Sequence, residues 1–177
     1  AWLQENIYDS EDVTITKVSE QYGVLNVCGP LSRELLSCVT SSDMSNKAHA
    51  FATYQTIEIA TKTLKAARVT YVGELGWELH IPIADLQAVY DALWSAGQDF
   101  GVTNAGYRAI ESCRLEKGYR YWSTDLTPDY SPYDAGLGFC IATDKEDFLG
   151  KQALTEIKAT GSKLKLITLT INEPIIL

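Results

Sequence analysis

The chain has 177 residues and a net charge of −8, from 15 Lys and Arg against 23 Asp and Glu. Its hydrophobic content of 46% can supply the core of one domain, or of one domain and part of another. The acidic balance and the absence of a basic run argue against binding to nucleic acid or anionic membranes, and no apolar run approaches the roughly 18 residues of a membrane span.

The cysteines and histidines predict neither disulfides nor a metal site. The four cysteines are widely spaced without a C-x-x-C motif, which favours reduced, buried thiols. His49 and His80 have no second ligand at metal-binding spacing, so we expect both to be structural. The chain lacks an initiator Met and stops directly after an alternating apolar run, so we expect it to be a piece of a longer polypeptide.

The first half of the chain predicts strands and one short helix. Alternating residues indicate strands over 13–20, 22–28 and 56–60. Ser32 is a suitable N-cap for a helix over 33–39.

The second half predicts mainly helices. Residues 85–100 form the clearest one, because apolar side chains recur at helical spacing. Asn104 is expected to cap a second helix that reaches about residue 117 and ends at Gly118. Further elements are a strand over 137–142, a helix over 148–160 that Gly161 stops, and a strand over 163–171. Since helices and strands mix without a βαβ rhythm, the predicted fold class is α+β.

The most informative stretch is YVGELGWELHIP, residues 71–82, which predicts a β-hairpin. Residues 68–72 and 77–81 alternate, and Gly73 and Gly76 bracket the turn. This register places Tyr71 directly opposite Glu78, while Trp77 and Leu79 point inward with the apolar face.

Glu78 and Tyr71 are the best candidates for ligand contact. A carboxylate accepts two parallel N–H donors, and a phenol can stack on a flat ring or hydrogen bond to it. The alternatives are a solvated surface glutamate and an ordinary cross-strand aromatic. Glu74, in the turn, is better explained as an exposed loop acid.

A second group of candidates surrounds the helix that follows residue 104. Its N-terminus can hold an anion or can simply be capped. The aromatic residues nearby can wall a flat ligand or pack onto a core: Tyr107, Tyr119, Tyr121 and Trp122. Arg114, Glu116 and Lys117 are predicted to be surface charges.

Several separated segments resemble the folate-binding aminomethyltransferase family, typified by the T-protein of the glycine cleavage system. They occur in the family's order and cover most of the chain: LNVCGP (25–30), YVGELGWE (71–78), RLEKG (114–118), PYDAGL (132–137) and FLGKQAL (148–154). The segments GELGWELHIP (73–82), NAGYRAI (104–110) and EKGYR (116–120) are most similar to the C-terminal part of the mitochondrial sarcosine dehydrogenase branch.

The resemblance implies a folate-binding domain with ferredoxin-like elements over residues 1–162, its N-terminal part missing, and the start of a C-terminal barrel domain over 163–177. It assigns folate binding to Tyr71, Glu78 and, less directly, Tyr119, with Glu78 facing the amino-pyrimidine edge of the pterin. The aspartate central to folate chemistry would lie upstream of residue 1, so this piece alone is expected to be inactive.

The resemblance also implies a two-part enzyme. A flavin domain of the same polypeptide, with FAD, would oxidise an N-methyl glycine, and tetrahydrofolate would receive the one-carbon unit. The implied location is the mitochondrial matrix, or the cytoplasm for a bacterial protein. Sarcosine and dimethylglycine remain alternative substrates.

Two other functions remain open within the resemblance. One is a non-catalytic regulatory subunit of pyruvate dehydrogenase phosphatase. The other is a stand-alone glycine-cleavage aminomethyltransferase, which is disfavoured because Ile110 replaces the arginine that these transferases have in the second helix. Arg108 does not align with that arginine.

Overall fold

The computed structural model describes residues 2–173. The chain divides into two compact units. The first contains the residues up to Thr70 together with Glu74–Asn104, and the second contains Tyr71–Gly73 together with the residues from Ala105 onward. The first unit therefore holds the sheet, and the second holds helices α4 (Tyr107–Glu116) and α5 (Lys151–Thr160).

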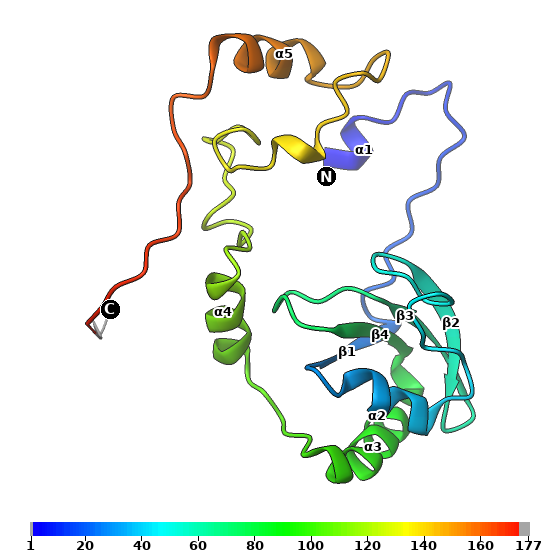
Figure 1. Ribbon diagram of the computed structural model, residues 1–177. Helices are drawn as coiled ribbons and strands as arrows, with labels where there is room; N and C mark the ends of the chain where they lie inside the picture. Colours follow the sequence, from blue (N-terminus) through cyan, green and yellow to red (C-terminus); the bar gives the residue numbers. More distant parts are fainter. Residues whose placement is uncertain (1, 174–177) are drawn as a thin grey trace. The chain divides into compact units, whose positions relative to one another are not determined.

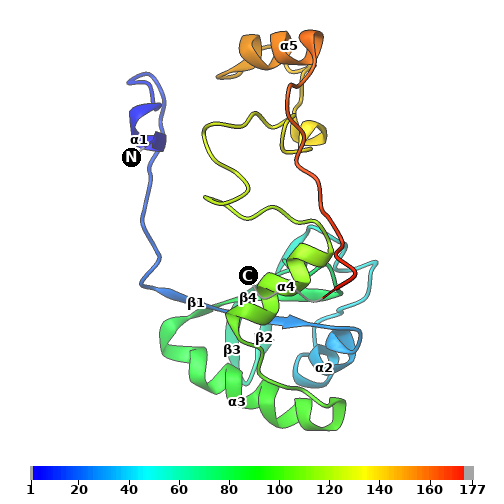
Figure 2. The same ribbon diagram turned by 90° about the vertical axis from the view of Figure 1, so that its left-hand side faces the viewer.

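The first unit is built on a four-stranded antiparallel sheet in the order β1-β4-β3-β2 (Figure 1). Its strands are β1 (Tyr22–Cys28), β2 (Tyr54–Ile59), β3 (Lys62–Ala67) and β4 (Gly76–Pro82). Helices α2 (Ser32–Val39) and α3 (Leu86–Gly97) cover one face of this sheet (Figure 2). The mixed helix-and-sheet architecture confirms the predicted fold class.

Strand β4 lies between β1 and β3, and its side chains point alternately into the core and towards the opposite face of the sheet. Trp77, Leu79 and Ile81 are fully buried, whereas Glu78 and His80 lie on the opposite face and are partly exposed. The inward orientation predicted for Trp77 and Leu79 is confirmed. The other buried members of this cluster are Leu36, Met44, Ile57, Ile59, Leu64, Ala66, Val89 and Leu93. Burial of each large apolar side chain stabilises the fold by about 1.5–3 kcal/mol.

The indole of Trp77 ties an irregular stretch to this core. Its Nε1–H donates to Nδ1 of His49 at 3.2 Å, and burial lowers the pKa of His49, which keeps that imidazole neutral. The guanidinium carbons of Arg33 and Arg68 lie 5.3 and 5.7 Å from the centre of the indole ring. Arg33 also donates to the side-chain oxygen of Asn46, and Arg68 to the carbonyl of His49. These contacts fix the segment around residues 44–49, which contains neither helix nor strand.

The register predicted for the hairpin is wrong. On the side away from β1, strand β4 pairs with β3 and not with residues 68–72, so Glu78 faces Ala67 and His80 faces Lys65. The connection between the strands is longer than expected. It includes Gly73, whose φ is +72°, and it closes with a hydrogen bond from Thr70 Oγ1 to the carbonyl of Glu74.

Gly76 is required at the start of β4 because the neighbouring strand passes very close. A Cβ there would lie 2.5 Å from the carbonyl oxygen of Val27 in β1. A side chain at this position would therefore push β1 and β4 apart.

Other predictions for the first unit have mixed outcomes. Strand β1 matches its predicted range, and α3 accounts for most of the helix predicted over 85–100. The strand predicted over 13–20 is wrong. Val13, Ile15 and Val18 are exposed and form no ladder with the described residues. Ser32 does not cap α2 and instead donates to the carbonyl of Leu75.

The second unit contains α4 (Tyr107–Glu116), α5 (Lys151–Thr160) and long irregular segments. Gly118 follows α4 and Gly161 follows α5, both with positive φ as expected for helix ends. Residues 138–140 form a turn of 3₁₀ helix, so the strand predicted over 137–142 is wrong.

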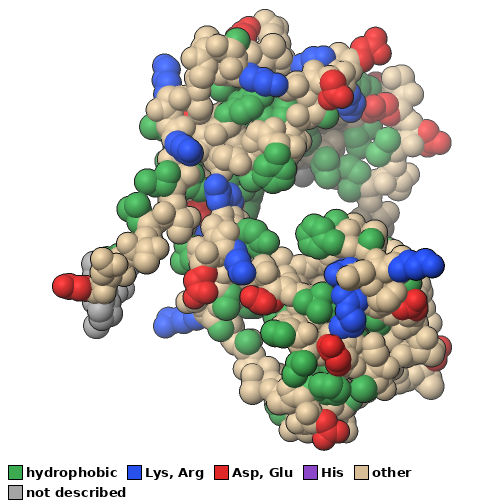
Figure 3. Space-filling model, in the orientation of Figure 1, with side chains coloured by type: hydrophobic (Ala, Val, Ile, Leu, Met, Phe, Trp, Pro, Cys, Tyr) green, Lys and Arg blue, Asp and Glu red, His purple; other side chains and the backbone are tan. Residues whose placement is uncertain are grey.

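Residues 163–171 form no strand with any described part of the chain. Most of their apolar side chains are exposed, and Figure 3 shows hydrophobic side chains at the surface along this C-terminal stretch: Leu164, Ile167, Leu169 and Ile171 are exposed. The domain boundary at 163 and the start of a barrel stay predictions, and residues 174–177 lie outside the described residues.

The cysteine side chains are exposed, so the expectation of buried thiols is wrong. Among the helices of residues 2–173, none combines the length and the hydrophobicity that crossing a membrane requires.

Asp134 anchors the C-terminal stretch. Its carboxylate accepts hydrogen bonds from the backbone and hydroxyl of Ser131, from the hydroxyl of Ser162 and from the backbone of Leu164. These bonds, led by those from the two serine hydroxyls, lower the pKa of Asp134 from its ordinary 3.8 to about 2. The carbonyl of Asp134 also accepts from the backbone N–H of Leu166 at 2.8 Å.

We expect Leu79→Ala to destabilise the first unit by about 2–5 kcal/mol, because it leaves a cavity in the core. The matched variant His80→Ala, one residue along the same strand, should change the free energy of unfolding by about 0.5 kcal/mol or less. Urea unfolding of both variants tests this. Similar losses for the two would contradict the assignment of faces on β4.

The anchoring by Asp134 should depend on pH. Because the folded pKa lies below the ordinary value, the ionised carboxylate stabilises the fold above pH 3.8 and loses this effect as the pH falls towards 2. The difference in unfolding midpoint between the parent and Asp134→Asn should therefore be largest near neutral pH and shrink towards pH 2. Asp144→Asn, at an exposed position, is the control. A pH-independent difference would contradict the role of the carboxylate.

Candidate functional site

Two of the three residues predicted to bind folate lie together in the second unit. The rings of Tyr71 and Tyr119 are stacked, with centroids 6.2 Å apart and planes 24° from parallel. The hydroxyl of Tyr71 donates to the backbone carbonyl of Arg120. Burial raises the pKa of Tyr71, so its phenol remains a hydrogen-bond donor at neutral pH.

Glycines at two turns place these aromatic residues. Gly73 adopts a left-handed φ, and a Cβ there would lie 2.4 Å from Cγ of Lys117. Gly118 ends α4 with a φ of +68°, after which the backbone N–H of Tyr119 donates to the carbonyl of Arg114 at 2.9 Å. The chain thus turns back directly after α4 and brings Tyr119 to Tyr71.

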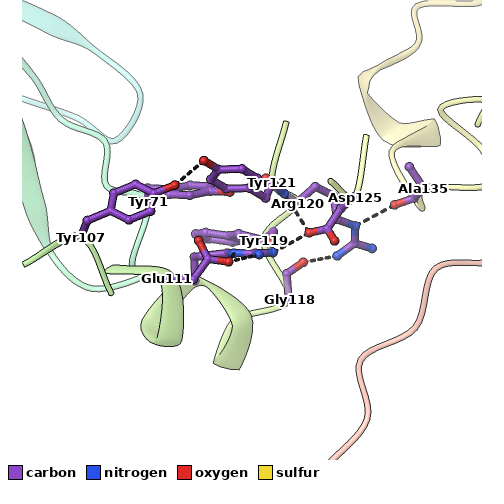
Figure 4. A network of polar contacts seen from close by, with 10 residues as sticks. Tyr71, Tyr107, Glu111, Gly118, Tyr119, Arg120, Tyr121, Asp125 and Ala135 are labelled. Carbon is purple, nitrogen blue, oxygen red and sulfur yellow. Dashed lines mark hydrogen bonds and ion pairs between the residues drawn. The ribbon is translucent and has the colours of Figure 1, made fainter. Parts of the chain in front are cut away.

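Arg114 is the centre of an ionic network with two acids, and Figure 4 shows these acids, Glu111 and Asp125, near Tyr119. Its side chain is only 4% exposed and forms ion pairs with Glu111 and Asp125. It also donates to the carbonyl of Tyr119 at 2.9 Å. The hydrogen bond to Glu111 raises the pKa of Arg114 against the opposing effect of burial, and Asp125 adds to the rise. The guanidinium is therefore permanently charged, and the prediction that Arg114 is a surface charge is wrong.

A second pair of tyrosines extends the network. Figure 4 shows the hydroxyl of Tyr107 hydrogen-bonded to the hydroxyl of Tyr121, and their rings meet edge to face. This hydrogen bond raises the pKa of Tyr107 to about 12. The guanidinium carbon of Arg114 lies 5.4 Å from the centre of the Tyr121 ring. Tyr107 and Tyr121 therefore belong to the site region, whereas Trp122 is 75% exposed.

A cavity of about 550 Å³ opens next to this network within the second unit. This volume lies in the range of small-molecule sites. Its walls combine the end of α4 with the C-terminal stretch, and they include Arg114, Tyr119, Arg120, Asp125 and residues 166–171. The cavity is thus bordered by aromatic and apolar groups and by side chains of both charges.

Glu78, the third predicted residue, belongs to the first unit. It lies on the face of β4 that points away from the core, between Asn26 of β1 and Ala67 of β3. Its side chain is 32% exposed, and Oε2 lies 3.7 Å from Nε2 of His80. A carboxylate at this position is accessible to a ligand, although Tyr71 does not face it across the ladder.

The remaining candidates are not part of this network. Asn104 does not cap α4, whose N-cap is Gly106, and instead its side chain donates to the hydroxyl of Tyr90 at 2.9 Å. No group of three or more His, Cys, Asp or Glu side chains within residues 2–173 could hold a metal ion.

Sequence reasoning missed the ionic part of the network. The spacing of Glu111 and Arg114, three residues apart on a helix, is a signal for an ion pair on one helix face. Nothing in the sequence indicates that Asp125, from a loop, completes a triad around a buried guanidinium.

Comparison with known proteins identifies the family. The GCVT N-terminal domain family matches residues 1–145, which is more than half of the chain. The chain belongs to this family, and the resemblance to the glycine cleavage T-protein family is confirmed.

The similar proteins include two dehydrogenases and a transferase. The chain is 48% identical to mitochondrial sarcosine dehydrogenase of Mus musculus over 158 residues, which is 89% of this chain and 17% of that protein. It is 39% identical to mitochondrial dimethylglycine dehydrogenase of Homo sapiens over 172 residues, 96% of this chain and 20% of that protein. An aminomethyltransferase of Lysinibacillus sphaericus (strain C3-41) is 35% identical over 166 residues, 94% of this chain and 45% of that protein. The chain therefore spans about a fifth of the length of the dehydrogenases.

We expect Arg114→Ala to destabilise the second unit by about 3 kcal/mol, because Glu111 and Asp125 would lose their shared cation in a partly buried site. Arg108→Ala, an exposed arginine on the same helix, is the matched control and should have little effect. Thermal unfolding of the two variants provides the comparison. An Arg114→Ala protein as stable as the control would show that the network contributes nothing to the fold.

Proposed function

We propose that this chain is the tetrahydrofolate-binding part of a sarcosine dehydrogenase-like flavoenzyme. The family relationship supports a folate-binding role, and the dehydrogenases reported above support the kind of enzyme. The observation on which the proposal depends is the stacked pair of Tyr71 and Tyr119 beside a cavity of small-molecule size.

The residues present are suited to a reduced pterin. Tyr71 and Tyr119 offer aromatic surface against which a flat heterocycle packs. Tyr119 lines the cavity, and the guanidinium of Arg114 holds Tyr119 by donating to its backbone carbonyl. Glu78 offers an accessible carboxylate that accepts the parallel N–H donors of an amino-pyrimidine edge.

In the proposed enzyme, FAD held by a separate domain of the same polypeptide would oxidise the N-methyl group of sarcosine or dimethylglycine. Tetrahydrofolate would take up the one-carbon unit as 5,10-methylenetetrahydrofolate, and the demethylated amine would be released. The present chain would bind and orient the folate. We also propose a mitochondrial location, because the two dehydrogenases are named as mitochondrial proteins.

The alternatives are less well supported. Ile110 stands where the stand-alone transferases have an arginine, which disfavours chemistry on a lipoyl-carried amine. A regulatory subunit would need no ligand contact from Glu78, so the variant below also tests that alternative.

We expect Glu78→Ala to weaken tetrahydrofolate binding by about 1.5–3 kcal/mol, or roughly 10- to 100-fold, the typical contribution of a hydrogen bond to a charged group. Calorimetric titration of the full-length protein measures this affinity. Glu58→Ala, an exposed glutamate on β2 of the same sheet, is the matched control and should bind folate as the parent does. Equal folate affinity in Glu78→Ala and the parent would refute the assigned role of Glu78.

A further inference from the structure

Two cationic side chains line the cavity of the second unit, and they differ in their partners. Arg114 and Arg120 both line this cavity. Arg114 is paired with Glu111 and Asp125. Arg120 forms no ion pair with any side chain of residues 2–173, and its hydrogen bonds go to two backbone carbonyls, those of Gly118 and Ala135. A carbonyl satisfies an N–H group but does not cancel the charge of a guanidinium.

The guanidinium of Arg120 is held in place by the surrounding backbone. Its Nε donates to the carbonyl of Ala135 at 2.8 Å, and its Nη1 donates to the carbonyl of Gly118. Gly136 lies against Nη2, where a Cβ would approach to 3.0 Å. Gly136 also adopts a left-handed φ of +71°, which favours glycine. A side chain fixed in this way loses little conformational freedom when it binds an anion.

The other walls of the cavity limit the kind of anion. Tyr119 supplies an aromatic surface, and Leu166 and Thr168 belong to the C-terminal stretch that also lines the cavity. The acid Asp125 also lines the cavity, but it already accepts hydrogen bonds from Arg114 and from the backbone of Tyr121. Glu116 is exposed to water, which screens its charge. A small inorganic anion would leave the aromatic and apolar walls unused, whereas an organic acid would cover them.

We propose that Arg120 binds a carboxylate of an organic ligand in this cavity, while Tyr119 packs against the ligand's apolar or aromatic part. A guanidinium pairs with a carboxylate through two parallel N–H···O bonds, which gives both strength and orientation. The identity of the ligand rests on the proposed function. Within that function two sources offer a carboxylate, namely the glutamate tail of folate and the N-methyl glycine substrate.

The test compares ligands with and without the carboxylate on the full-length protein. Calorimetry measures the binding of 5-formyltetrahydrofolate, of 5-formyltetrahydropteroate, which lacks glutamate, of p-aminobenzoylglutamate, and of sarcosine. The variants are Arg120→Gln and Arg120→Lys, with Arg108→Gln as the matched control for loss of one arginine charge. We expect Arg120→Gln to weaken binding of the carboxylate ligand at least tenfold, Arg120→Lys to weaken it less, and Arg108→Gln to have no effect.

The ligands separate the two sources. If the folate tail is bound, 5-formyltetrahydrofolate and p-aminobenzoylglutamate lose affinity in Arg120→Gln while 5-formyltetrahydropteroate does not. If the substrate is bound, sarcosine alone loses affinity. An equal loss for ligands with and without a carboxylate, or no loss for any of them, would overturn the proposal.

Comparing each acid with its methyl ester separates loss of the carboxylate contact from misfolding of a variant and from failure of folate binding. The parent should bind p-aminobenzoylglutamate at least tenfold more tightly than its methyl ester, a comparison that needs no variant. A flavin domain would also bind sarcosine, so for this ligand the ratio of acid to ester affinity is compared between the parent and Arg120→Lys and should fall in the variant. Equal binding of p-aminobenzoylglutamate and its ester, together with an unchanged sarcosine ratio in Arg120→Lys, would overturn the role of Arg120 even if Arg120→Gln failed to fold. Should the parent not bind 5-formyltetrahydrofolate at all, the proposed function fails, and these two comparisons still decide the carboxylate site.

Discussion

The second unit depends on the burial of one guanidinium. Removing the charge of Arg114 from water is costly unless acids neutralise it, and Glu111 from the same helix and Asp125 from the following loop do so. This requirement fixes the path of the chain after α4. The loop must return towards α4 so that Asp125 reaches Arg114. On this path the carbonyl of Tyr119 accepts a hydrogen bond from Arg114, and the ring of Tyr121 lies against the guanidinium. The aromatic wall of the candidate site is therefore a consequence of charge neutralisation as much as of apolar packing.

Elements with strong local patterns could be predicted from the sequence, and elements that depend on distant partners could not. The periodic apolar residues of α3 and the alternation in β1 are local signals, and both elements form where predicted. The same alternation over 13–20 gave no strand, because a strand needs a neighbour that periodicity does not reveal. The hairpin register failed for a related reason. The glycines at 73 and 76 suggested a tight turn, but strand β3 ends at Ala67, so the longer connection shifts the pairing of β4.

Part of the candidate site could be predicted from the sequence: the tyrosines follow from the family resemblance, whereas the arginines follow only from the structure. Resemblance selected Tyr71 and Tyr119 individually, and their stacking agrees with a shared role. No rule based on spacing could pair Tyr71 with a residue that lies beyond α4. Arg114 illustrates the opposite failure, since a charged helix residue is exposed far more often than buried. Its burial depends on Asp125, which lies 11 residues further along the chain. The position of Arg120 could not be predicted either, because its partners are backbone carbonyl groups, which carry no signal in the sequence.

The burial of Trp77 gives the protein a built-in optical probe. Of the four tryptophans, Trp2, Trp94 and Trp122 contact water, whereas the indole of Trp77 is enclosed in the core of the first unit and donates its N–H to a neutral imidazole. Its fluorescence emission should therefore lie at shorter wavelength than that of the others and move to longer wavelength when the sheet opens. Trp122, the one tryptophan of the second unit, is 75% exposed, so a shift of the emission to longer wavelength reports the opening of the first unit without any added label.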